Sequence, residues 1–163
     1  MKLGILSDTH IPDIKKEIPT WVTAGLKDCD YIIHAGDITG FKFLQRLKEL
    51  APVKAVRGNC DRGELVSQLK PYKELTLANL KLGITHGHLI EGDLITGLSY
   101  KFSSADLIIF GHTHNAFHQQ IAGQVFLNPG SATVRKRKSF YSFALVEIEA
   151  GRIINLEFIK KEG

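Results

Sequence analysis

Cysteines and long apolar runs are both scarce in this chain of 163 residues. Cys29 and Cys60 could form one disulfide bond at most, which argues against a disulfide-stabilised secreted domain, and we interpret both as free thiols. No apolar run approaches the roughly 20 residues that cross a bilayer. Asp8 interrupts the N-terminal apolar residues before a signal-peptide core could form. We therefore expect a cytoplasmic protein without a membrane segment.

A large excess of either charge is also missing. The chain has 21 Lys and Arg against 17 Asp and Glu, a formal net charge of +4, so charge alone selects no class of partner. With 44% hydrophobic and 23% charged residues, the composition excludes a disordered or fibrous chain. The length fits one compact domain, and we expect a single domain over residues 1–163.

Apolar runs alternate with amphipathic segments in the first part of the chain. Four apolar runs are predicted as buried strands, at residues 2–6, 31–35, 53–57 and 106–110. Four segments are predicted as helices, at residues 19–27, 43–50, 64–69 and 93–103. Further strands are expected at residues 74–85 (a hairpin), 117–121, 125–127, 140–149 and 153–160. This order predicts an α/β fold with a largely parallel sheet and a closing antiparallel section.

Polar clusters rich in histidine follow five of these strands. They contain Asp8, His10, Asp37, Asn59, His86, His112 and His114. Ligands bind beyond the carboxyl ends of strands in open α/β sheets, so we expect the clusters to meet at one side. Carboxylates, imidazoles and an amide suit Mn, Fe, Co, Ni or Zn, whereas Mg prefers more oxygen. Seven ligands exceed the need of one ion, and one shared carboxylate would serve two ions.

Simpler roles are open for each of these residues taken alone. Asp8 and Asp37 could be helix N-caps, and Asn59 beside a glycine could form a turn. His34 and His118 alternate with apolar neighbours, so we interpret them as packing or surface residues and leave them out of the site.

The order of the five clusters resembles that of the calcineurin-like metallophosphoesterases. The motifs are Asp8-x-His10, Gly36-Asp37, Gly58-Asn59, His86-Gly87-His88 and Gly111-His112-Thr113-His114. Small size, Cys60-Asp61 and the segment 128–131 (Asn-Pro-Gly-Ser) make the chain similar to the small single-domain phosphodiesterase branch of bacteria and archaea. The resemblance spans about the whole chain. It implies a four-layer α/β/β/α sandwich of two facing mixed sheets flanked by helices.

The resemblance also implies two divalent metal ions, with Mn²⁺ our first choice and Ni²⁺, Co²⁺, Fe²⁺ or Zn²⁺ as alternatives. The first ion would be held by Asp8, His10, Asp37 and His114. The second would be held by Asp37, Asn59, His86 and His112. With Asp37 as the bridge, the two ions would present a bridging hydroxide for in-line attack on phosphorus, without a covalent intermediate.

Cys60 departs from the pattern of many family members, which carry a histidine there, oriented by the following acid. Asp61 is retained, but a thiol is a poor general acid. His88 could supply the missing proton or phosphate contact. The predicted catalytic residues are therefore Asp37, Asn59, Asp61 and His88, in a metal-dependent phosphoric diester hydrolase.

Other functions remain open from the sequence. The alternatives are a nucleotide phosphomonoesterase or pyrophosphatase, and a non-catalytic scaffold or interaction module of the same fold. We expect a small or unstructured phosphodiester as the substrate. The basic run Arg135 to Lys138 is either a solvated connection or a patch that contacts phosphates or nucleic acid. Both a monomer and an oligomer are compatible with this sequence.

Overall fold

The computed structural model describes residues 1–13, 17–136 and 139–163, and it contains two five-stranded mixed sheets. The first sheet has the order β10-β9-β1-β2-β3. Its strands are β1 (Lys2–Leu6), β2 (Tyr31–Ala35), β3 (Val53–Val56), β9 (Phe140–Glu149) and β10 (Arg152–Glu162). The strands β1, β2 and β3 are parallel, whereas β9 is antiparallel to both β1 and β10.

The second sheet has the order β4-β5-β6-β8-β7. Its strands are β4 (Tyr72–Leu77), β5 (Leu80–Thr85), β6 (Leu107–Ile109), β7 (Ala116–Ile121) and β8 (Gln124–Pro129). The three central strands are parallel, and β4 and β7 are antiparallel edges. The hairpin between β4 and β5 turns at Ala78 and Asn79, both with positive φ, as the sequence predicts for a tight turn.

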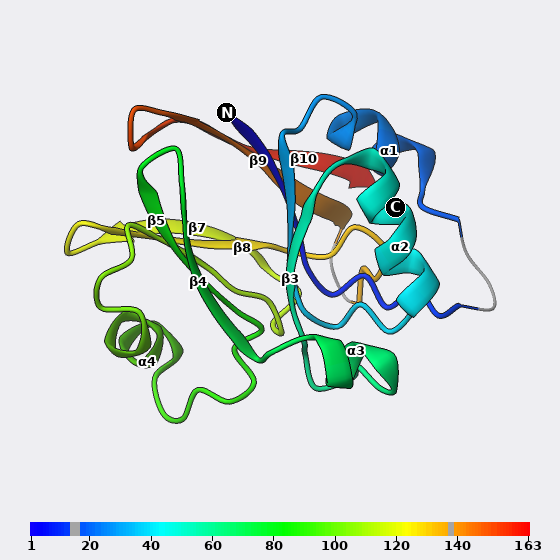
Figure 1. Ribbon diagram of the computed structural model, residues 1–163, viewed down its shortest axis with the longest axis horizontal. Helices are drawn as coiled ribbons and strands as arrows, with labels where there is room; N and C mark the ends of the chain where they lie inside the picture. The colour runs from blue at the N-terminus through cyan, green and yellow to red at the C-terminus, as the bar shows by residue number, and fades with distance from the viewer. Residues whose placement is uncertain (14–16, 137–138) are drawn as a thin grey trace.

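Helices cover the outer face of each sheet, which confirms the four-layer sandwich (Figure 1). The helices are α1 (Thr20–Leu26), α2 (Phe41–Leu50), α3 (Glu64–Gln68) and α4 (Leu94–Lys101). Helices α1 and α2 pack on the first sheet and α4 on the second, while α3 lies at the lower edge in Figure 1. In the part of the chain that the structure describes, no helix is long and apolar enough to span a membrane.

Three apolar clusters fill the spaces between these four layers. Leu26 and Leu47 from the helices pack with Ile32 on the outside of the first sheet. Ile33, the next residue along β2, points the other way and packs between the sheets with Leu107. This alternation follows the two-residue period of a strand, and each fully buried apolar side chain contributes about 1.5–3 kcal/mol.

The division into two sheets corrects the strand pattern read from the sequence, which predicted one largely parallel sheet. The parallel strands are split into β1–β3 and β5, β6 and β8, and β9 returns to pair with β1. Periodicity shows which residues of a strand are buried but not which sheet covers them. The second sheet was predicted by the family resemblance alone, and the structure confirms that prediction.

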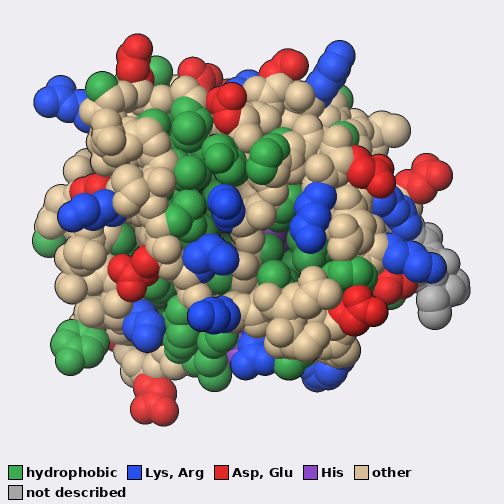
Figure 2. Space-filling view, viewed as in Figure 1, with side chains coloured by type: hydrophobic (Ala, Val, Ile, Leu, Met, Phe, Trp, Pro, Cys, Tyr) green, Lys and Arg blue, Asp and Glu red, His purple; other side chains and the backbone are tan. Residues whose placement is uncertain are grey.

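The face formed by the edge strands β3 and β4 combines basic and apolar side chains. Figure 1 views this face directly, and Figure 2 shows Lys and Arg side chains gathered over its middle, next to hydrophobic ones. Strands β3 and β4 are the free edges of the two sheets, so their side chains border the seam between the sheets. At one end of this seam lie the polar clusters that follow the parallel strands.

Candidate metal centre

The loops after β1 and β6 bring together Asp8, His10 and His114. Ligand atoms of all three residues lie within 4.8 Å of one another. The Nε2 atom of His114 is 3.1 Å from Oδ1 of the fully buried Asp8, and the rings of His10 and His114 stack with centroids 5.3 Å apart. These are three of the four residues predicted for the first ion.

Asp37, the predicted bridge, lies between this cluster and a second one. Ligand atoms of Asp8, Asp37 and His86 also lie within 4.8 Å of one another. The Oδ2 atom of Asp37 is 3.3 Å from Nε2 of His86 and 3.5 Å from Nε2 of His10. One carboxylate oxygen of Asp37 therefore faces a predicted ligand of each ion.

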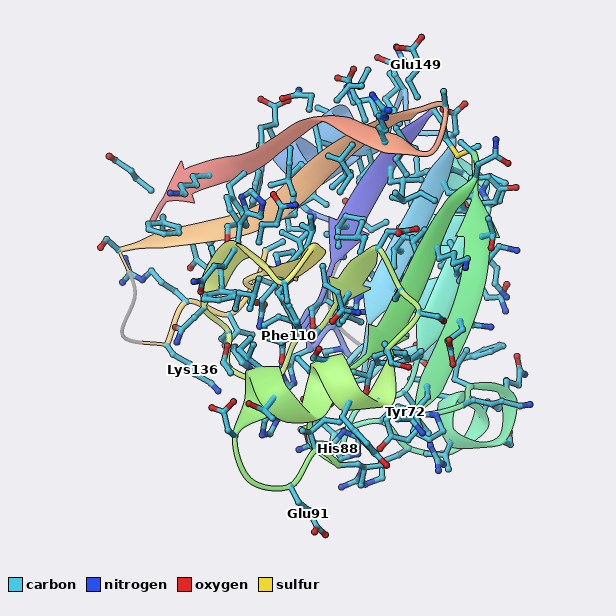
Figure 3. The ribbon with its side chains drawn as sticks, turned by 90° about the vertical axis from the view of Figure 1, so that its left-hand side faces the viewer. Tyr72, His88, Glu91, Phe110, Lys136 and Glu149 are labelled. Carbon is cyan, nitrogen blue, oxygen red and sulfur yellow. The ribbon has the colours of Figure 1, made fainter. Side chains whose placement is uncertain are left out.

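The remaining predicted residues surround His86 and the end of β3. The ring centroid of His112 is 5.2 Å from that of His86, and the ring of His88 is 5.4 Å from His86. In Figure 3, His88 lies at the end of the molecule opposite Glu149, which ends β9. Asn59 follows β3, and its side-chain nitrogen lies 3.5 Å from Sγ of Cys60.

Cys60 belongs to the centre more closely than the sequence indicated. Its sulfur lies in a group with ligand atoms of His10 and Asp37, all within 4.8 Å of one another. Sequence reasoning treated Cys60 only as a replacement for a histidine. Borderline divalent metals bind cysteine thiolates, so the sequence could have indicated Cys60 as a further candidate ligand. Both cysteines are free thiols, as expected.

Hydrogen bonds leave one ligand atom free on each central side chain. The Oδ2 atom of Asp8 accepts from Oγ of Ser7 at 2.7 Å and from the backbone N–H of His112 at 3.0 Å. The Oδ1 atom of Asp37 accepts from the backbone N–H of Cys60 at 2.8 Å. The Nδ1 atom of His86 lies 2.8 Å from the carbonyl oxygen of Ala35. Since a carbonyl only accepts, Nδ1 carries the proton and the Nε2 lone pair is free for a ligand bond.

The free atoms fit divalent metal ions. Oδ1 of Asp8 and Nε2 of His10 and His86 are buried and make no hydrogen bond. A buried polar atom without a partner costs about 1–3 kcal/mol, so several such atoms facing one another indicate a missing ligand. Two carboxylates with several imidazoles form the mixed oxygen and nitrogen set that Mn, Fe, Co, Ni and Zn accept. The residues present therefore fit the predicted metals.

Electrostatics keep the acids of the centre ionised. Burial alone raises the pKa of Asp37, but the neighbouring imidazole of His86, whose Nε2 lies 3.3 Å from Oδ2, outweighs burial and holds the pKa well below its usual range. Burial alone lowers the pKa of His86, but the carboxylates of Asp37 and Asp8 outweigh burial and raise it. A metal ion would compete with the proton on His86, so metal affinity falls as the pH falls.

Several predicted ligands share an unusual backbone conformation with a positive φ angle. Positive φ angles occur at five predicted ligands: Asp8 (53°), His10 (44°), Asp37 (54°), His112 (67°) and His114 (59°). Such angles are uncommon for residues other than glycine and persist where the surrounding structure enforces them. Here the backbone N–H of Asp8 donates to the carbonyl of Gly36 at 3.0 Å, and that of His10 to the carbonyl of Asp37 at 3.0 Å. These bonds hold the two loops side by side.

Two glycines of the motifs are required by close approach of the loops. A Cβ atom on Gly58 would overlap the carboxylate and backbone of Asp37, and one on Gly111 would overlap Oγ of Ser7 and approach Asp8. Neither neighbour is a flexible chain end that could move aside. The glycines therefore let the ligand loops pack directly against the acids.

Asp61, predicted as catalytic, braces the backbone of two ligand loops. Its Oδ2 accepts from the N–H of Gly58 at 2.7 Å and of Asp37 at 3.1 Å, and its Oδ1 accepts from the N–H of Thr39 at 2.8 Å. The side chain is 1% exposed. The carboxylate therefore fixes the position of Asp37 relative to the loop that carries Asn59.

Residues at the end of β8 and after it support the ligand loops that follow β1 and β6, a role that sequence reasoning did not assign to them. Oγ of Ser131 donates to the carbonyl of Asp8 at 2.7 Å, and Oγ1 of Thr133 donates to the carbonyl of Thr9. Nδ2 of Asn128 donates to the carbonyl of Gly111 at 2.8 Å. The signal was the segment 128–131, which the sequence analysis used only as a mark of resemblance.

His34 lies on β2, fully buried behind the ligand loops, with Nε2 3.0 Å from Oγ1 of Thr9. Burial lowers its pKa to about 3 from 6.5. Between these pH values the unfolded chain binds one more proton at this site, so stability falls as the pH drops below about 6.5.

We expect His34→Gln to reduce the pH slope of the unfolding free energy by up to about 1.4 kcal/mol per pH unit. Urea unfolding in EDTA at several pH values between about 4.5 and 6.5 measures how the free energy of unfolding depends on pH.

The control is His118→Gln, which removes an exposed histidine from β7. This variant should keep the slope of the wild-type protein. Equal slopes for His34→Gln and the wild-type protein would contradict the burial of a neutral His34.

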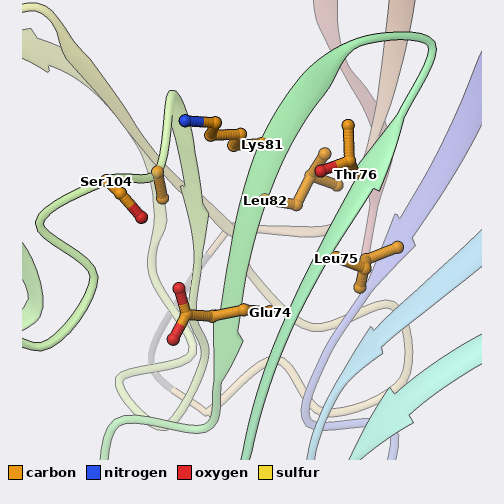
Figure 4. A pocket seen from close by; sticks show the side chains of 7 residues that line it. Glu74, Leu75, Thr76, Lys81, Leu82 and Ser104 are labelled. Atoms are coloured by element: carbon orange, nitrogen blue, oxygen red, sulfur yellow. The ribbon is translucent and has the colours of Figure 1, made fainter.

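Other cavities lie away from the centre. A cavity of about 250 Å³ beside β4 and β5 is drawn in Figure 4. It is lined by Glu74, Leu75, Thr76, Lys81, Leu82, Ser104 and Ala105, none of which is a predicted site residue.

Of the basic run at 135–138, Arg135 and Lys136 are described, and residues 137 and 138 lie outside the described residues.

The fold and the site together define a class of metal-binding α/β proteins, in which two stacked sheets aim acids and histidines from their strand ends at one point. Residues 1–151 match the family model of the calcineurin-like phosphoesterase superfamily domain. The chain therefore belongs to the calcineurin-like phosphoesterase superfamily.

Individual relatives agree with this assignment. A probable metallophosphoesterase of Methanothermobacter thermautotrophicus is 38% identical over 136 residues, which cover 82% of this chain and 78% of that protein. A phosphodiesterase of Methanocaldococcus jannaschii is 31% identical over 144 residues, which cover 80% of this chain and 83% of that protein. Among solved structures, a single mutant of Vps29 from Entamoeba histolytica superposes with a TM-score of 0.81 at 25% identity, covering 100% of this chain and 99% of that one.

Proposed function

We propose that this protein is a dinuclear metal-dependent phosphodiesterase. The observation that carries the proposal is the position of Asp37, whose Oδ2 lies 3.3 Å from His86 and 3.5 Å from His10, two residues predicted for different ions. When bound, two divalent ions would polarise the phosphoryl group and supply a hydroxide nucleophile near neutral pH.

The residues of the chain would position the ions and the substrate. Asp8, His10, Asp37 and His114 would hold one ion, and Asp37, Asn59, His86 and His112 the other. Ser7 fixes the Asp8 carboxylate and the carbonyl of Ala35 fixes the ring of His86, so the ligands need little reorganisation. The half-buried His88 would face the leaving group as a proton donor or phosphate contact.

Cys60 gives little help to a leaving group of high pKa, so that help would have to come from His88. The thiol lies beside Asp37 at a position where many family members carry an imidazole. A thiol is a weak hydrogen-bond donor and a poor general acid, so an alkoxide leaving group of high pKa gains little help from it. The choice of a diester is supported by the phosphodiesterase from Methanocaldococcus jannaschii among the relatives.

The test is hydrolysis of two model esters with controlled metal. We expect protein stripped with EDTA to lose at least about 100-fold in kcat/KM for bis(p-nitrophenyl) phosphate, because the ions supply several kcal/mol of transition-state stabilisation. Added Mn²⁺ should restore the activity, and the diester should be preferred over p-nitrophenyl phosphate at matched metal. Preference for the monoester would favour a nucleotide phosphomonoesterase.

A scaffold is the competing function, because the fold is shared with Vps29. The unpaired buried acid and imidazole atoms oppose it, since an interaction module has no need of unpaired buried ligands. Metal-replete protein that hydrolyses neither ester would favour the scaffold.

A further inference from the structure

Three cations are fixed to the loops that carry the metal ligands. Arg57 ends the segment that leads into Gly58, and its guanidinium lies 3.4 Å from the carbonyl of Val66. The guanidinium of Arg62 donates to the carbonyls of Asn59 at 2.6 Å and Asp61 at 2.7 Å. Lys136 follows the turn whose Ser131 and Thr133 bond the first ligand loop.

The topology places Arg57 and Lys136 on opposite sides of the centre. Arg57 follows β3, an edge of the first sheet, while Lys136 precedes β9, and β1 and β2 with their ligand loops lie between these two strands. Three strand spacings separate β3 from β9, which is roughly 14 Å. Both cations lie near the centre: after burial, Arg57 is among the charges that lower the pKa of His88, and Lys136 among those that lower the pKa of His112, whose rings lie 6.4 Å apart.

These cations are free to bind anions. Within residues 1–13, 17–136 and 139–163, no carboxylate oxygen lies within 4.0 Å of the charged nitrogens of Arg57, Arg62 or Lys136. Carbonyl partners orient the two guanidinium groups without neutralising them. The loops that carry the metal ligands therefore also carry cations without a carboxylate partner among the described residues.

Beyond Arg57, basic residues continue along the seam between the sheets. Lys54 on β3 and Lys73 on β4 are half-buried, and the backbone N–H of Arg57 donates to the carbonyl of the exposed Lys70 at 3.0 Å. Figure 2 shows Lys and Arg side chains over the middle of this face. In Figure 3, Lys136 lies at the same end of the molecule as His88. Basic side chains thus border both the seam and the end of the molecule that carries His88.

Building on the proposed function, we propose that the substrate is a single-stranded oligonucleotide, with Arg57 and Lys136 contacting phosphates on either side of the scissile one. The roughly 14 Å between the two strands exceeds the reach of a single phosphodiester group. A mononucleotide diester carries one charge and reaches neither side. An oligonucleotide carries one phosphate per nucleotide, so separate phosphates could contact the metal centre, Arg57 and Lys136 at the same time.

The experiment compares two substrates with the Mn²⁺-loaded protein: single-stranded octathymidylate and thymidine 5′-(p-nitrophenyl phosphate), which has one phosphate. The test variant is R57Q/K136Q. We expect the ratio of kcat/KM for the octamer to kcat/KM for the small diester to fall at least about tenfold. The plot of log kcat/KM against log salt for the octamer should become shallower by about 1.4, because each lost single-strand contact contributes about 0.7.

The matched control is K27Q/K48Q, which makes the same change in charge at exposed positions after α1 and in the last turn of α2, away from the ligand loops. It should keep the wild-type ratio and salt slope. If R57Q/K136Q gives the same octamer rates and slope as this control while the small diester is cleaved, the inference is overturned and the proposed function stands. Failure of the wild-type protein to cleave either substrate overturns both.

Discussion

Replacing Asp37 by asparagine should lower kcat/KM for bis(p-nitrophenyl) phosphate by at least about 1000-fold. The residue lies between predicted ligands of the two ions, with Oδ2 3.3 Å from Nε2 of His86 and 3.5 Å from Nε2 of His10. An amide removes the negative charge that would hold both ions. Loss of several kcal/mol of transition-state stabilisation gives this factor, since each 1.36 kcal/mol is tenfold in rate. Steady-state kinetics and elemental analysis should show activity and bound metal falling together.

The substitution is conservative for the fold. The carbonyl oxygen of the asparagine can still accept the N–H of Cys60, which Oδ1 of Asp37 accepts at 2.8 Å. The matched control is Asp28→Asn, the same change at an exposed acid, and it should retain full activity and metal. Wild-type turnover with a full metal complement in Asp37→Asn would refute the shared-carboxylate assignment.

The sequence predicts the strand ends and the residues that meet there, because both depend on local pattern. Ile5 and Ile33 lie in short apolar runs that each end in a polar cluster, and parallel strands place such ends at one edge. The structure brings Asp8, Asp37 and His86 together in the way this argument requires. Donor chemistry then predicts divalent metal ions without any knowledge of distances.

Pairings between distant strands and the backbone support of the site could not be predicted in this way. Apolar runs such as residues 107–109 fit either sheet, so only the long-range pairing of β9 with β1 settles the order. Positive φ at His10 and His114 violates local preference and is enforced by neighbouring loops. Asp61 illustrates the same limit, because its role depends on three backbone donors that no motif specifies.

Replacing Asp61 by alanine should lower the free energy of unfolding by at least about 3 kcal/mol, even without metal. The carboxylate accepts from the N–H groups of Gly58, Asp37 and Thr39 at 2.7, 3.1 and 2.8 Å. Alanine leaves these donors without a partner, and each unpaired buried donor costs about 1–3 kcal/mol. Urea unfolding in EDTA measures the loss, which should appear together with weaker metal binding, because Asp37 and the loop of Asn59 lose their common brace.

A graded pair of variants separates this brace from a direct role in catalysis. Asp93→Ala removes an exposed N-cap that accepts one N–H from Thr96 at 2.8 Å, so it should cost only about 1 kcal/mol and leave metal binding intact. Asp61→Asn retains one oxygen acceptor and should fall between the two in stability. If Asp61→Ala were as stable as the wild-type protein and bound metal normally but had a lower kcat, the carboxylate would act on the reaction itself. The three short bonds to backbone N–H groups favour the opposite result, since a carboxylate whose oxygens are held by the backbone has little freedom to orient a catalytic side chain.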